Sequence, residues 1–221
     1  MSGRITALKV QKRNPQRVNV HIDGRFAFGL AAIEALQLRI GQNLSDPEIA
    51  RLREKDQVEV AYEFALRFLS YRPRSIAEVR RRLTEKQFDT PTVDEAVVRL
   101  SRAGLLDDTA FAQYWLENRD AFRPRSSRAL RYELRQKGVA DSVIDAILAD
   151  YDERDASYRA AVHQAQKLAR RPDQDFDVIR RKLLAFLNRR GFSYPIARDT
   201  VERISTEVGD TGVETWTTER D

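Results

Sequence analysis

Two short arginine-bearing stretches have the composition of anion-binding loops. The tetrapeptide RPRS occupies residues 72–75 and recurs 51 residues later at 123–126, and an aromatic residue precedes each copy. In each copy a proline fixes the backbone between two guanidinium groups, which can bind a phosphate or a carboxylate in bidentate fashion. The alternative is that the arginines are solvated and that Ser75 and Ser126 only cap the following helices. The candidate binding residues in these loops are Arg72, Arg74, Arg123 and Arg125.

Further basic residues lie on the helices that follow. Arg80 and Arg131 occupy the same position relative to the two RPRS copies, whereas Leu184 occupies it in a third, weaker copy. The largest basic cluster lies in that third copy, and we predict that it is the strongest electrostatic contact to nucleic acid. A charged, solvent-exposed helix face is the alternative. The cluster consists of Arg170, Arg171, Arg180, Arg181, Lys182, Arg189 and Arg190.

The sequence carries little that indicates an enzyme. His21 and His163 are the only histidines, and they lie in a predicted strand and a predicted helix. The phosphate-binding patterns GxGxxG and GxxxxGK[ST] are absent, as is a nucleophile elbow. There is no cysteine, which excludes disulfides and thiolate metal sites. Asp107 and Asp108 are interpreted as a helix cap. We expect no catalytic residues, no cofactor and no metal ion.

The RPRS recurrence extends into a repeat with a period of about 50 residues. Apolar residues match at an offset of 51 between the first two copies and at a further offset of 53 for the third. Such a period is typical of tandem helical units that pack against their neighbours. The matched sets are Val79/Leu130/Leu183, Leu83/Leu134/Leu187, Phe88/Val139/Phe192, Val97/Leu148/Val201 and Leu100/Tyr151/Ile204, whereas Ala197 breaks the run at the position of Val93 and Ile144.

Each repeat is predicted to consist of three helices. In the first, residues 62–69 show helical apolar spacing, Ser75–Glu78 forms a capping box, and Pro91 suits the first turn of a third helix. Gly138 and Gly191 stand where a left-handed cap would end the second helix. The first repeat has Gln87 there, so either Gln87 accepts a strained conformation or that helix ends differently.

The two ends of the chain differ from the repeats. The N-terminal block predicts a meander of three antiparallel strands with a tight turn at Asp23-Gly24, followed by helical segments at residues 31–38 and 46–54. From about Gly209 the chain is acidic and rich in threonine, which indicates a disordered tail, although Trp216 is unusual in such a segment.

These patterns predict a mainly α protein with three tandem three-helix units in an elongated, curved array, preceded by the small β meander. Its 221 residues carry a net charge of +5, which favours a polyanionic or acidic partner. No apolar run is long enough to cross a membrane, and the N-terminus lacks the apolar core of a signal peptide, so we expect a cytoplasmic protein. The predicted divisions are residues 1–60, 61–108, 109–152, 153–208 and 209–221.

Three stretches resemble one known family. The sequences RPRSIAEVRRRLTEKQF (72–88), LDDTAFAQYWLENR (106–119) and LRYELRQKGV (130–139) are similar to the RecX family, bacterial regulators of the RecA recombinase. The resemblance covers residues 62–150 well and extends more loosely to about 206. The N-terminal block also looks like the extension found in many members, whereas Gln87 replaces the glycine that members commonly carry.

The resemblance implies a non-enzymatic regulator that acts as a monomer in DNA repair, homologous recombination and the SOS response. RecX-like proteins bind RecA, generally in the groove of the RecA–DNA filament, and usually inhibit filament extension, strand exchange and ATP hydrolysis. The alternative is a free-standing, non-specific DNA-binding protein, since the repeats have the size of helix-turn-helix modules. Its binding to single- or double-stranded DNA would fall steeply with salt and need no recombinase. Phe111, Tyr114 and Trp115 could stack on bases, but the i, i+4 spacing of Phe111 and Trp115 predicts core residues.

Overall fold

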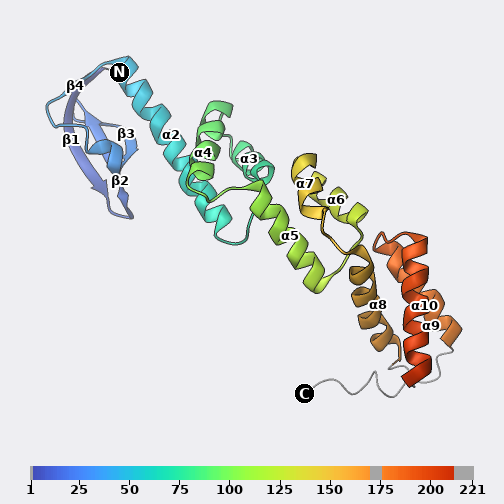
Figure 1. The fold of residues 1–221 in the computed structure, drawn as a ribbon. Coiled ribbons are helices and arrows are strands. Elements are labelled where there is room, and N and C mark those ends of the chain that lie inside the picture. The colour runs from blue at the N-terminus through green and yellow to red at the C-terminus, as the bar shows by residue number, and fades with distance from the viewer. Residues whose placement is uncertain (1, 170–175, 212–221) are drawn as a thin grey trace. The chain divides into compact units, whose positions relative to one another are not determined.

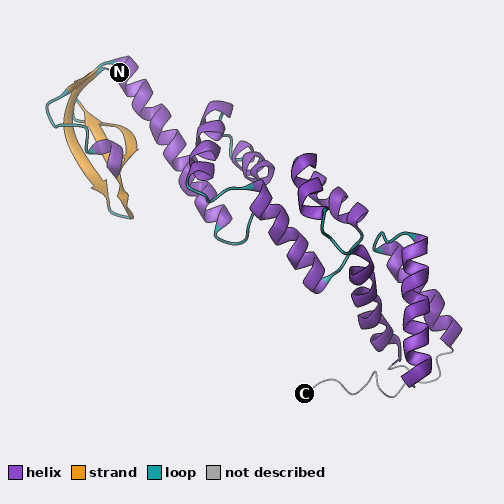
Figure 2. Ribbon diagram, viewed as in Figure 1, coloured by secondary structure: helices purple, strands orange, loops and turns teal. Residues whose placement is uncertain are grey.

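The computed structural model describes residues 2–169 and 176–211, which belong to two compact units. Unit 1 extends to Asp107 and unit 2 begins at Asp108. All strands of the described residues lie at the start of unit 1, and the remaining elements are helices (Figure 2). The predicted mainly α class with a small N-terminal sheet is confirmed.

The N-terminal sheet is antiparallel and has the strand order β3-β2-β1-β4. The turn between β2 and β3 has positive φ angles at both Asp23 (48°) and Gly24 (80°), as a type I′ hairpin turn requires. The predicted meander is therefore confirmed, but the short β4, which pairs with β1, was not predicted because two residues give no alternating pattern. The strands are β1 (Gly3–Gln11), β2 (Asn14–Ile22), β3 (Arg25–Ala31) and β4 (Asn43–Leu44).

The helices after the sheet differ from the prediction. The expected helix at 31–38 is a single turn, α1 (Ala32–Ala35), and the expected segments 46–54 and 62–69 form one helix, α2 (Asp46–Leu69). Residues 48–69 contain no glycine or proline, so nothing in the sequence interrupts the helix there. A capping box between Ser45 and Glu48 begins α2.

One buried carboxylate attaches α2 to the sheet. Asp56 is only 8 % exposed, and its two oxygens accept hydrogen bonds from the backbone amide of Ala31 (3.1 Å) and from Nη2 of Arg17 (2.7 Å). Both partners belong to the sheet, so the first half of α2 is attached to β2 and β3, while its second half packs along α4 (Thr90–Arg102) (Figure 1).

The described helices form the three predicted repeats. The first repeat uses the C-terminal half of α2 with two further helices, and the others have three helices each. In unit 2, the helices α8 (Glu153–Ala169), α9 (Phe176–Arg189) and α10 (Tyr194–Thr211) all contact one another. The helices between α2 and α8 are α3 (Ile76–Glu85), α4 (Thr90–Arg102), α5 (Asp108–Phe122), α6 (Ser127–Gln136) and α7 (Asp141–Leu148).

Each repeat has its own hydrophobic core. The sheet and the three repeats hold four separate buried clusters, and the matched residues Leu83, Leu134 and Leu187 are each fully buried in one of them. Tyr151 packs against the clusters of both the second and the third repeat. The aligned apolar positions are therefore core positions, as the period predicted.

The second helix of every repeat ends in the same way. Residues Gln87, Gly138 and Gly191 have positive φ angles of 64°, 77° and 92°. The residue that follows each of them donates a backbone hydrogen bond to the matched leucine carbonyl. Gln87 thus adopts the strained left-handed cap, which settles the alternative that the sequence left open.

The C-terminal helix continues past its predicted end. The sequence indicated a disordered tail from Gly209, but α10 extends to Thr211. Residues 212–221, which make up the rest of the predicted tail and include Trp216, lie outside the described residues.

Candidate functional site

The first RPRS loop (residues 72–75) is held by the carboxylate of Glu78, which lies in the first turn of α3. The hydroxyl oxygen of Ser75 accepts from the amide of Glu78 (3.1 Å), and the Glu78 carboxylate accepts from the amide of Ser75, so the predicted capping box is confirmed. The same carboxylate pairs with Nη2 of Arg72 (3.0 Å), whose Nη1 donates to the Pro73 carbonyl. Arg72 is therefore engaged within its own loop.

Arg74 is held by an aromatic ring. Its guanidinium lies 4.1 Å from the centroid of the Phe68 ring, the distance of a cation–π contact. Burial is the main cause that lowers the Arg74 pKa, and nearby Arg72 adds to the effect. Both arginines of the first loop thus have structural partners.

In the second RPRS loop (residues 123–126), Arg125 joins a buried network. Its Nε lies 3.1 Å from a carboxylate oxygen of Glu133, whose other oxygen accepts from Nε1 of Trp115 and from Nε of Arg119, both at 2.8 Å. The Glu133 side chain is 15 % exposed, so one largely buried carboxylate pairs with two guanidinium groups and accepts a hydrogen bond from an indole.

Arg123 differs from its counterpart Arg72. Ala129 occupies the position of Glu78 in the second repeat, so the carboxylate that holds Arg72 is missing there. Ser126 still caps α6 by accepting from the Ala129 amide (3.1 Å). Arg123 is exposed, and among the described residues no carboxylate is paired with it.

The end of α9 contacts the second RPRS loop. Nη1 of Arg190 donates to the Pro124 carbonyl (2.9 Å), and the Ser126 amide donates to the Arg190 carbonyl (3.3 Å). The Arg190 guanidinium also lies 4.6 Å from the Phe186 ring centroid. Burial is the main cause that lowers the Arg190 pKa, followed by the positive charges of Arg125 and Arg123. The fold therefore brings three predicted arginines from two repeats into one cluster, Arg123, Arg125 and Arg190, hereafter the arginine cluster.

The two matched helix arginines have matched acidic partners. Arg80 pairs with Asp94 and Arg131 pairs with Asp145, each joining the second and third helices of its repeat. In the third repeat the corresponding residues are Leu184 and Arg198, so this ion pair is not repeated. The pairing favours a structural role for Arg80 and Arg131 over direct binding.

The basic residues of α9 are exposed. Arg180 lies 3.9 Å from Glu202 in a pair that is about half exposed, and Nε of Arg181 donates to the Asp177 carbonyl (3.4 Å). Lys182 and Arg189 are also exposed. Arg170 and Arg171 lie outside the described residues.

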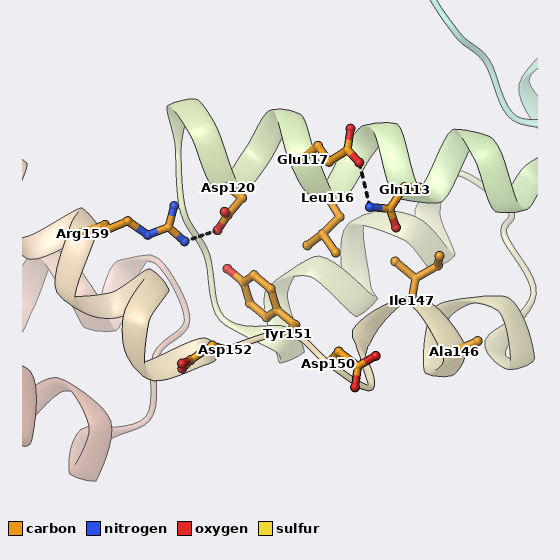
Figure 3. A pocket seen from close by; sticks show the side chains of 10 residues that line it. All are labelled: Gln113, Leu116, Glu117, Asp120, Ala146, Ile147, Asp150, Tyr151, Asp152 and Arg159. Atoms are coloured by element: carbon orange, nitrogen blue, oxygen red, sulfur yellow. Dashed lines mark hydrogen bonds and ion pairs between the residues drawn. The ribbon is translucent and has the colours of Figure 1, made fainter.

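Unit 2 also carries an acidic groove of about 490 Å³ between α5, α7 and the start of α8 (Figure 3). Three of its four carboxylates have internal partners: Asp120 accepts from Arg159 (2.7 Å), Glu117 accepts from Gln113 (2.7 Å), and Asp152 accepts from two amides at the start of α8. The Tyr151 hydroxyl donates to the Arg125 carbonyl (2.8 Å), and burial raises the Tyr151 pKa. The Asp120–Arg159 contact joins α5 of the second repeat to α8 of the third, so at least this part of the groove has a structural role.

The remaining candidates lie in the core or at the surface of the described residues. Phe111 is 2 % exposed and stacks at 5.9 Å on Trp115, which confirms the core interpretation, and Tyr114 is partly exposed. His21 lies in β2 and His163 lies on the exposed surface of α8. Within the described residues, no three potential metal ligands gather at one place, and no helix has the length and apolarity to span a bilayer.

Several of these relationships between side chains were not predicted from the sequence. In the second loop, Glu133 pairs with Arg125, and Ala129 leaves Arg123 without the carboxylate that Arg72 has. Neither residue was predicted to have this role. The repeat offset of 51 contained a usable signal, since it relates Asp94 to Asp145 and Glu78 to Ala129. The groove residues come from three helices and share no pattern in the sequence.

Fold and site together define a helical-repeat protein with arginine side chains in the loops between its helices. Models of known protein families match the sheet and each of the three repeats. They match residues 3–45 as the N-terminal domain of regulatory protein RecX, and residues 61–100, 107–148 and 155–201 as the first, second and third three-helix domains of RecX. The chain belongs to the RecX family of regulatory proteins.

Relatives and solved structures agree with this assignment. The regulatory protein RecX of Clostridium botulinum strain Eklund 17B is 31 % identical over 213 residues, covering 94 % of this chain and all of that protein. RecX of Mycobacterium sp. strain KMS is 39 % identical over 153 residues, covering 67 % of this chain and 83 % of that protein. A crystal structure of regulatory protein RecX has a TM-score of 0.71 at 24 % identity, covering 92 % of this chain and all of that one. The structural likeness supports the fold.

Proposed function

We propose that this chain binds the RecA recombinase on its DNA filament and inhibits filament extension, strand exchange and ATP hydrolysis. Membership of the RecX family is the observation that carries the proposal. The protein acts as a monomer in the cytoplasm, without a cofactor, by binding rather than by catalysis.

The charge distribution supports such a partner. A RecA–DNA filament combines phosphates with a protein surface, so exposed arginines can find counter-charges on it. Most loop arginines of unit 1 and the helix arginines Arg80 and Arg131 have internal partners. The basic residues of α9 are exposed, and Arg180 lies 3.9 Å from its acidic neighbour Glu202, so we assign the filament contact to this helix. The third repeat bridges successive protomers in the groove and blocks monomer addition or the movements linked to ATP turnover.

The direct test is single-stranded-DNA-dependent ATP hydrolysis by the RecA of the same organism, with the full chain titrated in at fixed salt. We expect hydrolysis to fall at substoichiometric amounts of the chain. Unchanged hydrolysis at excess chain would reject the proposal.

A triple charge reversal tests the surface itself. Arg180→Glu, Arg181→Glu and Arg189→Glu together should weaken inhibition at least ten-fold, because three exposed cations become anions. The matched control reverses three exposed arginines of unit 1, Arg25, Arg39 and Arg51, and changes the net charge equally. Equal loss in both variants would indicate that only net charge matters and would remove the α9 contact.

A further inference from the structure

We propose that the second RPRS loop, together with Phe122 before it and the end of α9, binds single-stranded nucleic acid directly. A backbone phosphate lies between Arg123 and Arg190, and a neighbouring base stacks on Phe122. This binding goes beyond the proposed function, because it needs no recombinase. The loop would contact the nucleic acid rather than the protein of a filament.

Carboxylates neutralise only part of the positive charge of the arginine cluster. In the first repeat Arg72, the arginine that follows the aromatic residue, pairs with Glu78 at 3.0 Å, and Arg74 lies over the Phe68 ring. In the second repeat Ala129 replaces that glutamate, and Arg190 brings a further positive charge. Of the arginine cluster, only Arg125 is paired with a carboxylate among the described residues. The cluster therefore carries positive charge that a phosphate oxygen can compensate.

The packing explains why the glutamate is missing. A Cβ atom on Gly191 would lie 3.0 Å from the Ala129 side chain, so the end of α9 occupies the space that a longer side chain would need. The docking of the third repeat thus adds Arg190 beside a loop in which Glu133 pairs with Arg125, while Arg123 has no carboxylate partner among the described residues.

The loop is also fixed before any ligand arrives. Pro124 and Ser126 are buried. The Pro124 carbonyl accepts a hydrogen bond from Arg190, and the Ser126 amide donates one to the Arg190 carbonyl. A ligand that binds Arg123 therefore orders one side chain rather than a whole loop, which lowers the entropic cost of binding.

The aromatic residue decides the class of ligand. Phe122 is 77 % exposed, although Pro124 and Ser126 of the adjoining loop are buried. An exposed ring beside uncompensated arginines is the combination with which proteins bind single strands, since every unpaired base offers a face for stacking. A duplex presents phosphates but hides its base faces, and an acidic protein surface offers carboxylates without a requirement for a ring. The ring therefore favours a single strand.

The first loop supplies a control within the same chain. Tyr71 precedes it and is 83 % exposed, so the aromatic residue is present there as well. Its neighbour Arg72 is already paired with Glu78. If stacking requires an adjacent free arginine, Phe122 should matter for binding and Tyr71 should not.

The experiment measures binding of the full chain to a fluorescent oligothymidylate, without RecA, by fluorescence anisotropy at several salt concentrations. We expect Phe122→Ala and Arg123→Ala each to weaken binding about ten-fold, and Arg123→Ala to reduce the salt slope by about 0.7 for one lost phosphate contact. Tyr71→Ala and Arg102→Ala, which alter an exposed ring and an exposed arginine of unit 1, should change binding less than two-fold. Circular dichroism verifies that each variant is folded.

The outcomes separate this inference from the proposed function. Unchanged oligonucleotide binding in both Phe122→Ala and Arg123→Ala would overturn it, and so would equal affinity for a duplex of the same length. If these variants bind DNA normally but no longer inhibit RecA, the loop contacts the recombinase, and the inference fails while the proposed function stands. If the loop variants lose DNA binding and the unaltered chain has no effect on RecA, the inference stands and the proposed function fails.

Discussion

Gly191 approaches Ser126 so closely that a Cβ atom on Gly191 would stand 2.5 Å from the Ser126 hydroxyl oxygen. The glycine ends α9 in the third repeat, and the serine caps α6 in the second repeat. The φ angle of Gly191, 92°, also lies in the region that favours glycine. One residue thus meets two requirements, a left-handed helix cap and a close approach between neighbouring repeats.

Gly191→Ala should therefore cost more than an ordinary glycine replacement. Its matched control is Gly104→Ala, because Gly104 also has a positive φ (69°) but has no atom within 4 Å of the added methyl group. We expect the control to lose about 1 kcal/mol from backbone strain and Gly191→Ala to lose about 2 kcal/mol more from overlap. Urea unfolding monitored by circular dichroism measures both, and equal losses would contradict the close approach.

Much of this fold follows from patterns in the sequence. The period of about 50 residues places Leu83, Leu134 and Leu187 in three equivalent cores, because a repeated apolar stripe must be buried in every copy. The hairpin turn and the capping box at Ser75 follow from local residue chemistry. The joining of two predicted helices into α2 was missed, because a polar stretch without glycine or proline gives no signal of where a helix ends.

Gln87 provides a test of the shared helix end. It holds a left-handed φ of 64° in the position where the other repeats have glycine. Gln87→Gly should stabilise unit 1 by roughly 0.5–1 kcal/mol, because glycine removes the steric strain at a small cost in unfolded-state entropy. Gln87→Ala removes the same exposed side chain but keeps the strain, so it should give no gain. A gain in urea unfolding for both variants would attribute the effect to the side chain instead.

The candidate site was less predictable than the fold. The sequence identified every arginine of the cluster, but it could not show which ones are neutralised. Arg72 and Arg123 are identical in local sequence, and the difference lies in Glu78 and Ala129, one helical turn into the next helix. Charge compensation depends on pairs brought together by folding, whereas a count of basic residues treats all of them alike.

Glu133 is predicted to be the most important single carboxylate of the second repeat. It compensates Arg119 and Arg125 and accepts from Trp115, and its side chain is largely buried. Glu133→Ala should destabilise unit 2 by about 2–3 kcal/mol, since it leaves two guanidinium groups without their partner. Its control is Glu85→Ala, which breaks an exposed pair with Arg82 and should cost at most about 0.5 kcal/mol.

Tryptophan fluorescence can follow the Glu133 variant locally. In a Trp216→Phe background, Trp115 is the only tryptophan left in the chain. Its emission maximum should shift to the red in Glu133→Ala as the indole loses its hydrogen bond and contacts more water. Equal unfolding midpoints for the Glu133 and Glu85 variants would show that the network adds no stability beyond a surface pair.

Asp89 should make the stability of unit 1 depend on pH in the acid range. Its carboxylate caps α4 by accepting from the Thr92 amide (3.0 Å), and the hydrogen bonds from the side chain and the backbone of Thr92 lower its pKa. Because the folded pKa lies below the unfolded value of about 3.9, the stabilisation is complete above about pH 4 and is lost as the pH falls through the folded pKa. Asp89→Asn keeps a capping oxygen but cannot titrate, so its thermal midpoint should fall less between pH 5 and pH 3 than that of the unaltered chain. Glu95→Gln, which neutralises an exposed carboxylate on the same helix, is the control, and an equal reduction of the pH dependence in both variants would refute the capping explanation.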